Sequence, residues 1–184
     1  MRFLKDRGFV LRRINFGDSD RYVTLFSENH GKIEVVAKGI RKITSHRTGA
    51  TEPLNLIEFQ TVKSAKNHIL TEVKLINSFD HLKRELSSIR KVFLMCELID
   101  AVLPLGVRHD DIFDLIERAG TKMLENEKNM AYFQAKLLSI LGFWDNSASF
   151  KNEAHVTAYV EEIIEHKLRS ASAFTSESTR FDIK

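Results

Sequence analysis

The sequence has little cysteine and proline and no long hydrophobic run. Its 184 residues include one Cys and two Pro. Because Cys96 stands alone, an internal disulfide and every zinc motif with several cysteines are excluded. No apolar stretch approaches the roughly 20 residues that cross a membrane, and the first residues lack the apolar core of a signal peptide. We therefore expect a cytoplasmic protein without membrane attachment, in which Cys96 is a buried thiol.

Motifs of common enzyme classes are also missing. The sequence has no Gly-x-Ser-x-Gly, no Walker loop and no His-Glu-x-x-His. Asp18 and Asp20 have the spacing of a carboxylate pair that can chelate a hard cation, but Asp, Ser and Gly together are more typical of a turn. We expect no catalytic residue, no metal, no cofactor and no small-molecule substrate.

Positive charge is concentrated in the first part of the chain. Residues 1–78 carry 14 Lys or Arg against 8 Asp or Glu, whereas residues 79–184 carry 14 against 17. The net charges are therefore +6 and −3, within a total of +3. A basic region suits a polyanion such as nucleic acid. A solvated, lysine-rich surface would explain the charge equally well.

The stretch 31–42 combines a strand pattern with cations. Ile33, Val35 and Ala37 alternate with more polar neighbours, which predicts a strand with one buried face. Four further segments have similar strand patterns, at 8–14, 21–26, 54–62 and 68–76. Five short strands with the longest connection between the third and fourth are typical of an OB-fold barrel. Such barrels bind nucleic acid through a cationic groove and exposed aromatic side chains.

The candidate DNA-binding residues follow from this interpretation. Candidates for phosphate contacts are Arg12, Arg13, Arg21, Lys32, Lys38, Arg41, Lys42, Arg47, Lys63 and Lys66. Phe16 and Tyr22 are candidates for base stacking. At a spacing of two residues, however, an aromatic side chain lies in a core more often than on a binding surface.

From Phe79 onward the hydrophobic period becomes helical. Helices are predicted from Phe79 to Leu103, from an N-cap at Asp110 or Asp111, from about Met130 to Leu141, and from Glu153 to Ala171. The predicted fold class is therefore α+β, with an N-terminal five-stranded OB-fold barrel followed by an all-α domain. We expect domains at residues 1–78 and 79–171 and a flexible tail at 172–184.

Three segments of the barrel region resemble the RecO family of bacterial recombination mediators. They are 9–13 (Phe-Val-Leu-Arg-Arg), 17–26 (Gly-Asp-Ser-Asp-Arg-Tyr-Val-Thr-Leu-Phe) and 30–42, which begins His-Gly-Lys and ends Lys-Gly-Ile-Arg-Lys. Residues 141–143 (Leu-Gly-Phe) and 167–171 (Lys-Leu-Arg-Ser-Ala) extend the resemblance more loosely. Many members of the family carry a Cys-x-x-Cys zinc module after the Leu-Gly-Phe position, whereas residues 144–150 of this chain contain no cysteine.

The resemblance implies a non-enzymatic function in DNA repair and recombination. A RecO-type protein binds single-stranded and double-stranded DNA, anneals complementary strands, and works with RecR and the C-terminal tail of SSB to load RecA on SSB-coated DNA. It is cytoplasmic and associated with the nucleoid. Two alternatives remain at this stage: an adaptor that binds proteins with weak or no DNA binding, and an RNA-binding OB-fold protein.

Overall fold

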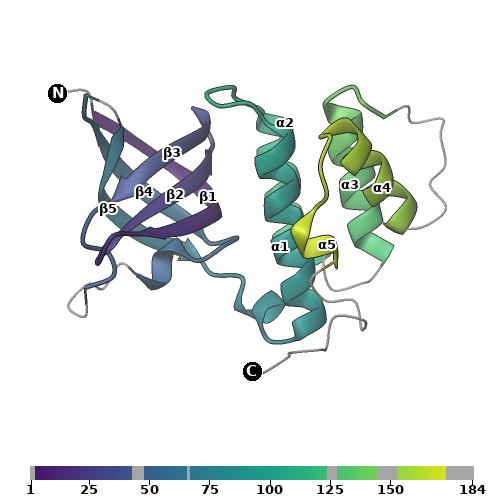
Figure 1. Ribbon diagram of the computed structural model, residues 1–184, viewed down its shortest axis with the longest axis horizontal. Helices are drawn as coiled ribbons and strands as arrows, with labels where there is room; N and C mark the ends of the chain where they lie inside the picture. Colours follow the sequence, from purple (N-terminus) through teal and green to yellow (C-terminus); the bar gives the residue numbers. More distant parts are fainter. Residues whose placement is uncertain (1–2, 43–47, 66, 124–127, 145–152, 173–184) are drawn as a thin grey trace, which may run out of the picture.

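The computed structural model describes residues 3–42, 48–65, 67–123, 128–144 and 153–172. Within these residues a barrel of strands lies at one end and helices lie at the other, with α1 and α2 beside the barrel and α3 and α4 beyond them (Figure 1). This arrangement confirms the predicted fold class. In chain order the elements are β1 (Phe3–Phe16), β2 (Asp20–Ser27), β3 (Gly31–Ala37), the 3₁₀ turn η1 (Gly49–Thr51), β4 (Leu56–Lys63), β5 (His68–Asn77), the 3₁₀ turn η2 (Asp80–Lys83), α1 (Leu86–Val102), α2 (Asp110–Arg118), the π-helical turn η3 (Ala119–Met123), α3 (Lys128–Ile140), α4 (Glu153–Ile163) and α5 (Arg169–Ser172).

The described strands close into a barrel in the order β1-β2-β3-β5-β4. β1 makes closure possible because it is long enough to pair with two strands. Its first half is antiparallel to β4, from Phe3 opposite Val62 to Phe9 opposite Leu56. Its second half is antiparallel to β2. A short parallel contact between β3 and β5 completes the ring.

The predicted first strand, 8–14, was too short, since β1 begins at Phe3. Three consecutive charged residues, Lys5-Asp6-Arg7, interrupt the alternation of apolar and polar residues by which a strand is recognised. Asp6 is buried, and its carboxylate accepts hydrogen bonds from the Ser27 hydroxyl, the Asn29 backbone N–H at 3.0 Å and the Asn29 amide at 2.7 Å. Burial alone would raise the pKa of Asp6, but hydrogen bonds from Ser27, His30 and Asn29 outweigh it and lower the pKa. A charged residue therefore continues the strand by binding the β2–β3 turn.

Two hydrophobic cores use opposite faces of the barrel strands. The core inside the barrel includes Val10, Val23, Leu25, Val35, Ile57, Phe59 and Leu70. The second core lies between the barrel and the helices. It takes Phe9 and Phe26 from the outside of the barrel and packs them against Phe113 of α2, with ring centroids 4.8 and 6.2 Å apart. The alternation along β1 and β2 thus serves both cores.

The helices differ from the predicted ones at three places. The helix expected over Phe79–Leu103 is divided into η2 and α1, because Glu85 between them has an extended backbone (φ −114°, ψ 141°). The N-cap position of α2 is occupied by His109, so Asp110 belongs to the first turn instead. The last helix is interrupted after Ile163, since Glu165 has φ 56°. Periodicity does not report such single-residue breaks.

Cys96 is buried within the second core, as expected. Burial raises the pKa of its thiol to about 12, so the thiolate that would react is scarce at neutral pH. Among the described helices, none combines the length and the apolar character needed to cross a membrane.

A close backbone contact fixes the helices against the barrel at the start of β3. The backbone N–H of Gly106 donates to the carbonyl of Lys32 at 2.8 Å. Gly31 has φ 65°, and a Cβ at this position would lie 1.9 Å from the carbonyl oxygen of Val107. A glycine is therefore required at position 31 both by its backbone conformation and by the neighbouring chain.

We predict that Gly31→Ala lowers the free energy of unfolding by at least about 2 kcal/mol, because the methyl group clashes with backbone that cannot rotate away. Gly49→Ala is the matched control, since a Cβ there meets no atom within 4 Å. It should change stability by less than about 0.5 kcal/mol. Urea unfolding of both variants measures the difference, and equal stabilities would contradict the contact.

Candidate nucleic-acid interface

The outer face of β1 and β2 is divided between the helices and solvent. Near one end of the hairpin, Phe9 and Phe26 are buried against α2. Toward the β1–β2 turn, the outward positions Ile14, Phe16 and Tyr22 are exposed. The helices therefore cover one half of this face and leave an apolar half open.

Phe16 and Tyr22 form an exposed aromatic pair. Their side chains are 56% and 39% exposed, and their ring centroids lie 5.1 Å apart with an interplanar angle of 59°. The prior expectation that such residues lie in a core is wrong for both. Exposed rings offer flat faces on which bases can stack without sequence preference. The aromatic pair is therefore the feature of the barrel best suited to single-stranded nucleic acid.

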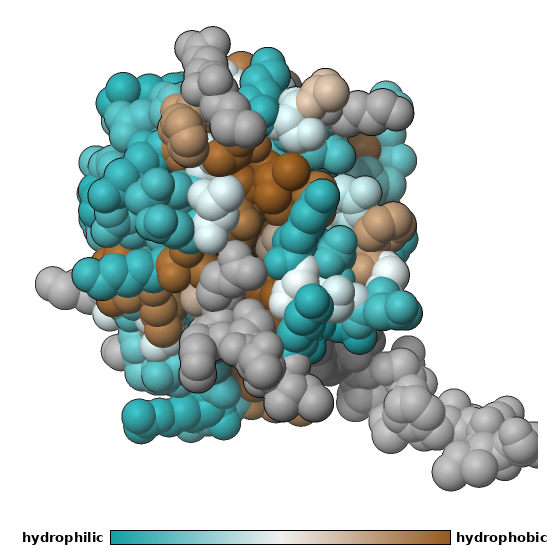
Figure 2. All heavy atoms as spheres, turned by 90° about the vertical axis from the view of Figure 1, so that its left-hand side faces the viewer, coloured by the Kyte–Doolittle hydropathy of each residue, from teal (hydrophilic) through white to brown (hydrophobic). Residues whose placement is uncertain are grey.

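Tyr22 of the aromatic pair is also part of an apolar row that crosses the outside of the barrel. In this row each residue lies opposite the next on the neighbouring strand, in the order Ile14, Tyr22, Val36, Ile69, Val62 and Phe3. Viewed from the side away from the helices, the surface has hydrophobic atoms in its middle and hydrophilic side chains around them (Figure 2). Ile14 and Phe3 were not predicted as surface residues, although Ile14 is two residues from Phe16 and shares its face.

Arg41 and Lys42 lie beside the turn that carries the aromatic pair. The Arg41 backbone N–H donates to the carbonyl of Ser19 at 2.9 Å, and its guanidinium donates to the carbonyl of Gly17 at 3.2 Å. The chain after β3 is thereby held against the β1–β2 turn, and both cations are exposed. Phosphates of a strand stacked on the aromatic pair would be within the field of these two charges.

Four other predicted cations are exposed on the described part of the chain. Lys38 directly follows β3, and Lys63 ends β4. Arg12 pairs with Asp100 of α1 at 3.3 Å, and Arg13 pairs with Glu52 at 2.7 Å. Exposed ion pairs of this kind are weak and leave their arginines available to a phosphate. Arg47 and Lys66 lie outside the described residues.

Arg21 and Lys32 are placed where a phosphate cannot reach them, which corrects the expectation for both. Arg21 is 4% exposed, and its guanidinium donates to the side chains of Asn15 at 3.1 Å and Thr51 at 2.9 Å. Burial, together with the nearby Arg13, lowers the pKa of this guanidinium. Lys32 donates to the carbonyl of Asp100 at 2.5 Å in the contact with α1. The alternation along the strands predicted that both side chains point outward. It could not predict that the segment around Thr51 covers Arg21 and that α1 covers Lys32.

No group of three or more His, Cys, Asp or Glu side chains among the described residues is arranged to hold a metal ion. Asp20 instead supports the expected turn, since its carboxylate accepts a hydrogen bond from the backbone N–H of Gly39 at 2.7 Å. Its function in the described structure is to connect the end of β3 to the start of β2.

Comparison with known proteins agrees with this geometry. The family model described as "Recombination protein O N terminal" matches residues 1–79. The DNA repair protein RecO of Symbiobacterium thermophilum is 31% identical over 140 residues, which are 74% of this chain and 55% of that protein. The RecO of Acetivibrio thermocellus is 26% identical over 147 residues, 78% of this chain and 59% of that protein. The chain thus spans little more than half the length of these relatives.

The burial of Arg21 generates a prediction about stability. Arg21→Ala should lower the free energy of unfolding by about 1–3 kcal/mol, because it removes a buried side chain that donates to the buried hydroxyl of Thr51. Arg41→Ala removes the same side chain from an exposed position and should change stability by less than about 0.5 kcal/mol. Thermal or urea unfolding of the two variants compares them directly. Equal losses would show that Arg21 is not a structural residue.

Proposed function

Because the chain belongs to the RecO family of DNA repair proteins, we propose that it binds DNA without catalysing a reaction and acts in recombinational repair. The observation that carries the proposal is the exposed aromatic pair of Phe16 and Tyr22 beside Arg41 and Lys42. Rings of this kind stack on bases, and the cations neutralise phosphates. Single-stranded DNA is the ligand that uses both contacts, because its bases are accessible.

Strand annealing follows from the same surface. Two complementary strands repel each other through their phosphates, and cations that bind one strand lower that repulsion. Because stacking on aromatic rings leaves the pairing edges of bases unoccupied, a bound strand can still meet its complement. Double-stranded DNA keeps its base faces stacked within the helix, so the cations alone supply its weaker binding. Loading of RecA on SSB-coated DNA with RecR completes the proposal and rests on family membership.

The experiment that tests the proposal is fluorescence anisotropy of a labelled single-stranded oligonucleotide, titrated with the full chain at several salt concentrations. Binding that weakens steeply with salt supports it. Absence of binding at low salt overturns it in favour of an adaptor that acts through proteins. Tighter binding of RNA than of DNA of the same sequence would instead favour an RNA-binding barrel.

We predict that the double variant Arg41→Ala with Lys42→Ala binds single-stranded DNA more weakly at low salt. Each lost phosphate contact should reduce the steepness of log K against log salt by about 0.7, so the double variant should lose about 1.4. Arg118→Ala with Lys136→Ala, on α2 and α3, makes the same change in net charge at exposed positions outside the barrel. If both double variants have the same salt slope, the phosphate path does not follow the β1–β2 turn.

The aromatic pair should contribute through stacking. Phe16→Ala with Tyr22→Ala is expected to weaken binding of single-stranded DNA by about 1–3 kcal/mol for each base that stacks, while the salt slope stays unchanged. The control Tyr132→Ala removes an exposed ring from α3, distant in sequence from the barrel. The same anisotropy titrations compare the affinities of the double variant and of the Tyr132→Ala control for single-stranded DNA. An unchanged affinity in the double variant would exclude the aromatic pair as the stacking surface.

A further inference from the structure

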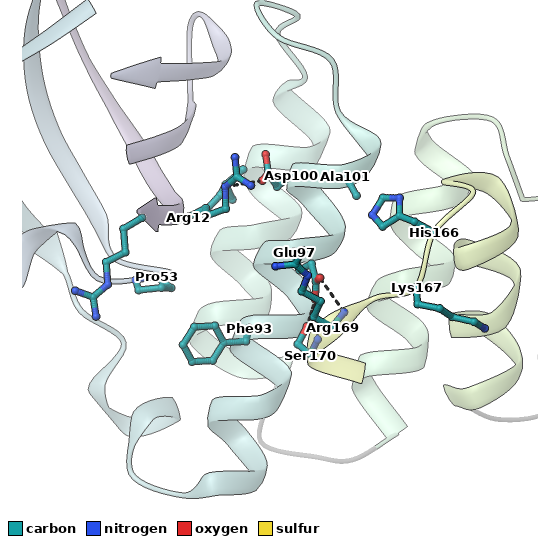
Figure 3. A pocket seen from close by; sticks show the side chains of 12 residues that line it. Arg12, Pro53, Phe93, Glu97, Asp100, Ala101, His166, Lys167, Arg169 and Ser170 are labelled. Atoms are coloured by element: carbon teal, nitrogen blue, oxygen red, sulfur yellow. Dashed lines mark hydrogen bonds and ion pairs between the residues drawn. The ribbon is translucent and has the colours of Figure 1, made fainter. Parts of the chain in front are cut away.

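A cavity of about 750 Å³ lies at the junction between the barrel and the helices. We call it the junction pocket. Its walls are Arg12 and Arg13 in the second half of β1, Pro53 before β4, Phe93 on α1, and the chain around Arg169 (Figure 3). Pockets of 300–1,000 Å³ are the size that encloses small organic groups. A nucleotide base with its sugar fits within that range.

Phe93 provides an exposed ring at this pocket. The ring is 44% exposed although its helix neighbours Val92 and Leu94 are buried. Figure 3 shows the ring pointing from α1 toward the barrel, between Pro53 and Arg169. The face of such an exposed ring is the kind of surface on which a base stacks.

The two acidic residues of the pocket are already occupied by contacts within the protein. Glu97 accepts hydrogen bonds from the backbone N–H groups of Arg169 and Ser170, both at 2.9 Å, and from the Ser170 hydroxyl. Asp100 lies 3.4 Å from the ammonium of Lys32 and 3.3 Å from the guanidinium of Arg12. Two cations therefore offset the charge of Asp100, whereas the donors to Glu97 are neutral and leave it negatively charged.

The remaining charge of the pocket is positive. Arg12, Arg13 and Arg169 are exposed at its rim, and the carboxylate partners of Arg12 and Arg13 can be replaced by a phosphate because exposed pairs are weak. Lys167 does not contribute, since its side chain points away from Phe93 in Figure 3. The pocket thus combines arginines, which can bind phosphate in a bidentate manner, with the ring of Phe93.

The strand β1 connects the junction pocket to the aromatic pair. Arg12 lines the pocket, and Phe16 of the aromatic pair is four residues farther along the same strand, about 13 Å away. Ile14 lies between them on the same exposed face. A nucleic-acid strand that follows β1 from the aromatic pair therefore arrives at Arg12 and Arg13.

We propose that the junction pocket binds an unstacked nucleotide of single-stranded nucleic acid, with its base on Phe93 and its phosphates at Arg12, Arg13 and Arg169. This inference rests on the proposed function, because the neighbouring nucleotides lie on the aromatic pair. A paired base cannot enter such a pocket without leaving its duplex, which costs unstacking energy. The pocket therefore discriminates single strands from duplexes, whereas the cations of the barrel bind both.

The test is Phe93→Ala in the full chain, with Tyr132→Ala as the control that removes an exposed ring away from the pocket. Anisotropy titrations use a 16-nucleotide single strand and a duplex of about the same length. We expect affinity for the single strand to fall about tenfold, with affinity for the duplex and the salt slope unchanged. An unchanged affinity for the single strand, or an equal loss for both ligands, overturns the inference.

Photocrosslinking of the unmodified protein tests the contact directly. A single strand that contains 5-iodouracil should crosslink to the peptide that holds Phe93 as well as to the peptide of the aromatic pair. Crosslinks confined to barrel peptides overturn the junction pocket alone. If Phe16→Ala with Tyr22→Ala weakens binding while Phe93→Ala does not, the proposed function stands and this inference fails. If the unmodified protein binds no DNA, both fail.

Discussion

The packing of Phe9 and Phe26 on Phe113 is the contact on which the rest of this structure depends. Both rings point outward from the barrel and lie in the second core, with centroids 4.8 and 6.2 Å from that of Phe113. Each fully buried phenyl ring contributes about 2–3 kcal/mol relative to an exposed one. Because the barrel and the helices share this core, α1 and α2 are held at one half of the β1–β2 face.

The position of the helices decides which residues remain for a ligand. Lys32 faces the same way as other outward residues of β3, yet α1 approaches and its ammonium bonds the carbonyl of Asp100. Phe16 and Tyr22 lie beyond the reach of the helices and stay exposed. The same packing creates the junction pocket, where Arg12 of the barrel and Phe93 of α1 line one cavity. Binding surface and domain contact are therefore two consequences of one packing arrangement.

Much of the fold was accessible from local patterns. Alternation at Ile33, Val35 and Ala37 predicted a strand, and each of these residues packs in or against the barrel core. The presence of five strands and the fold class were correct because turns between short strands are encoded by neighbouring residues. The start of β1 was missed since Asp6 satisfies its charge with groups of the β2–β3 turn, which no local pattern reports. The breaks at Glu85 and Glu165 were missed for a related reason, because periodicity does not detect a single non-helical residue.

By itself, the sequence determined the order of strands and helices, the basic character of the first part and the absence of cysteine motifs, because each is a property of neighbouring residues. Whether Arg21 was buried and Arg41 exposed was decided only by the tertiary structure, since both are arginines near turns and differ in what covers them. The same holds for Phe16 and Phe93. Alternation along a strand says which side chains share a face, but only packing between distant segments says whether that face is covered by protein or open to a ligand.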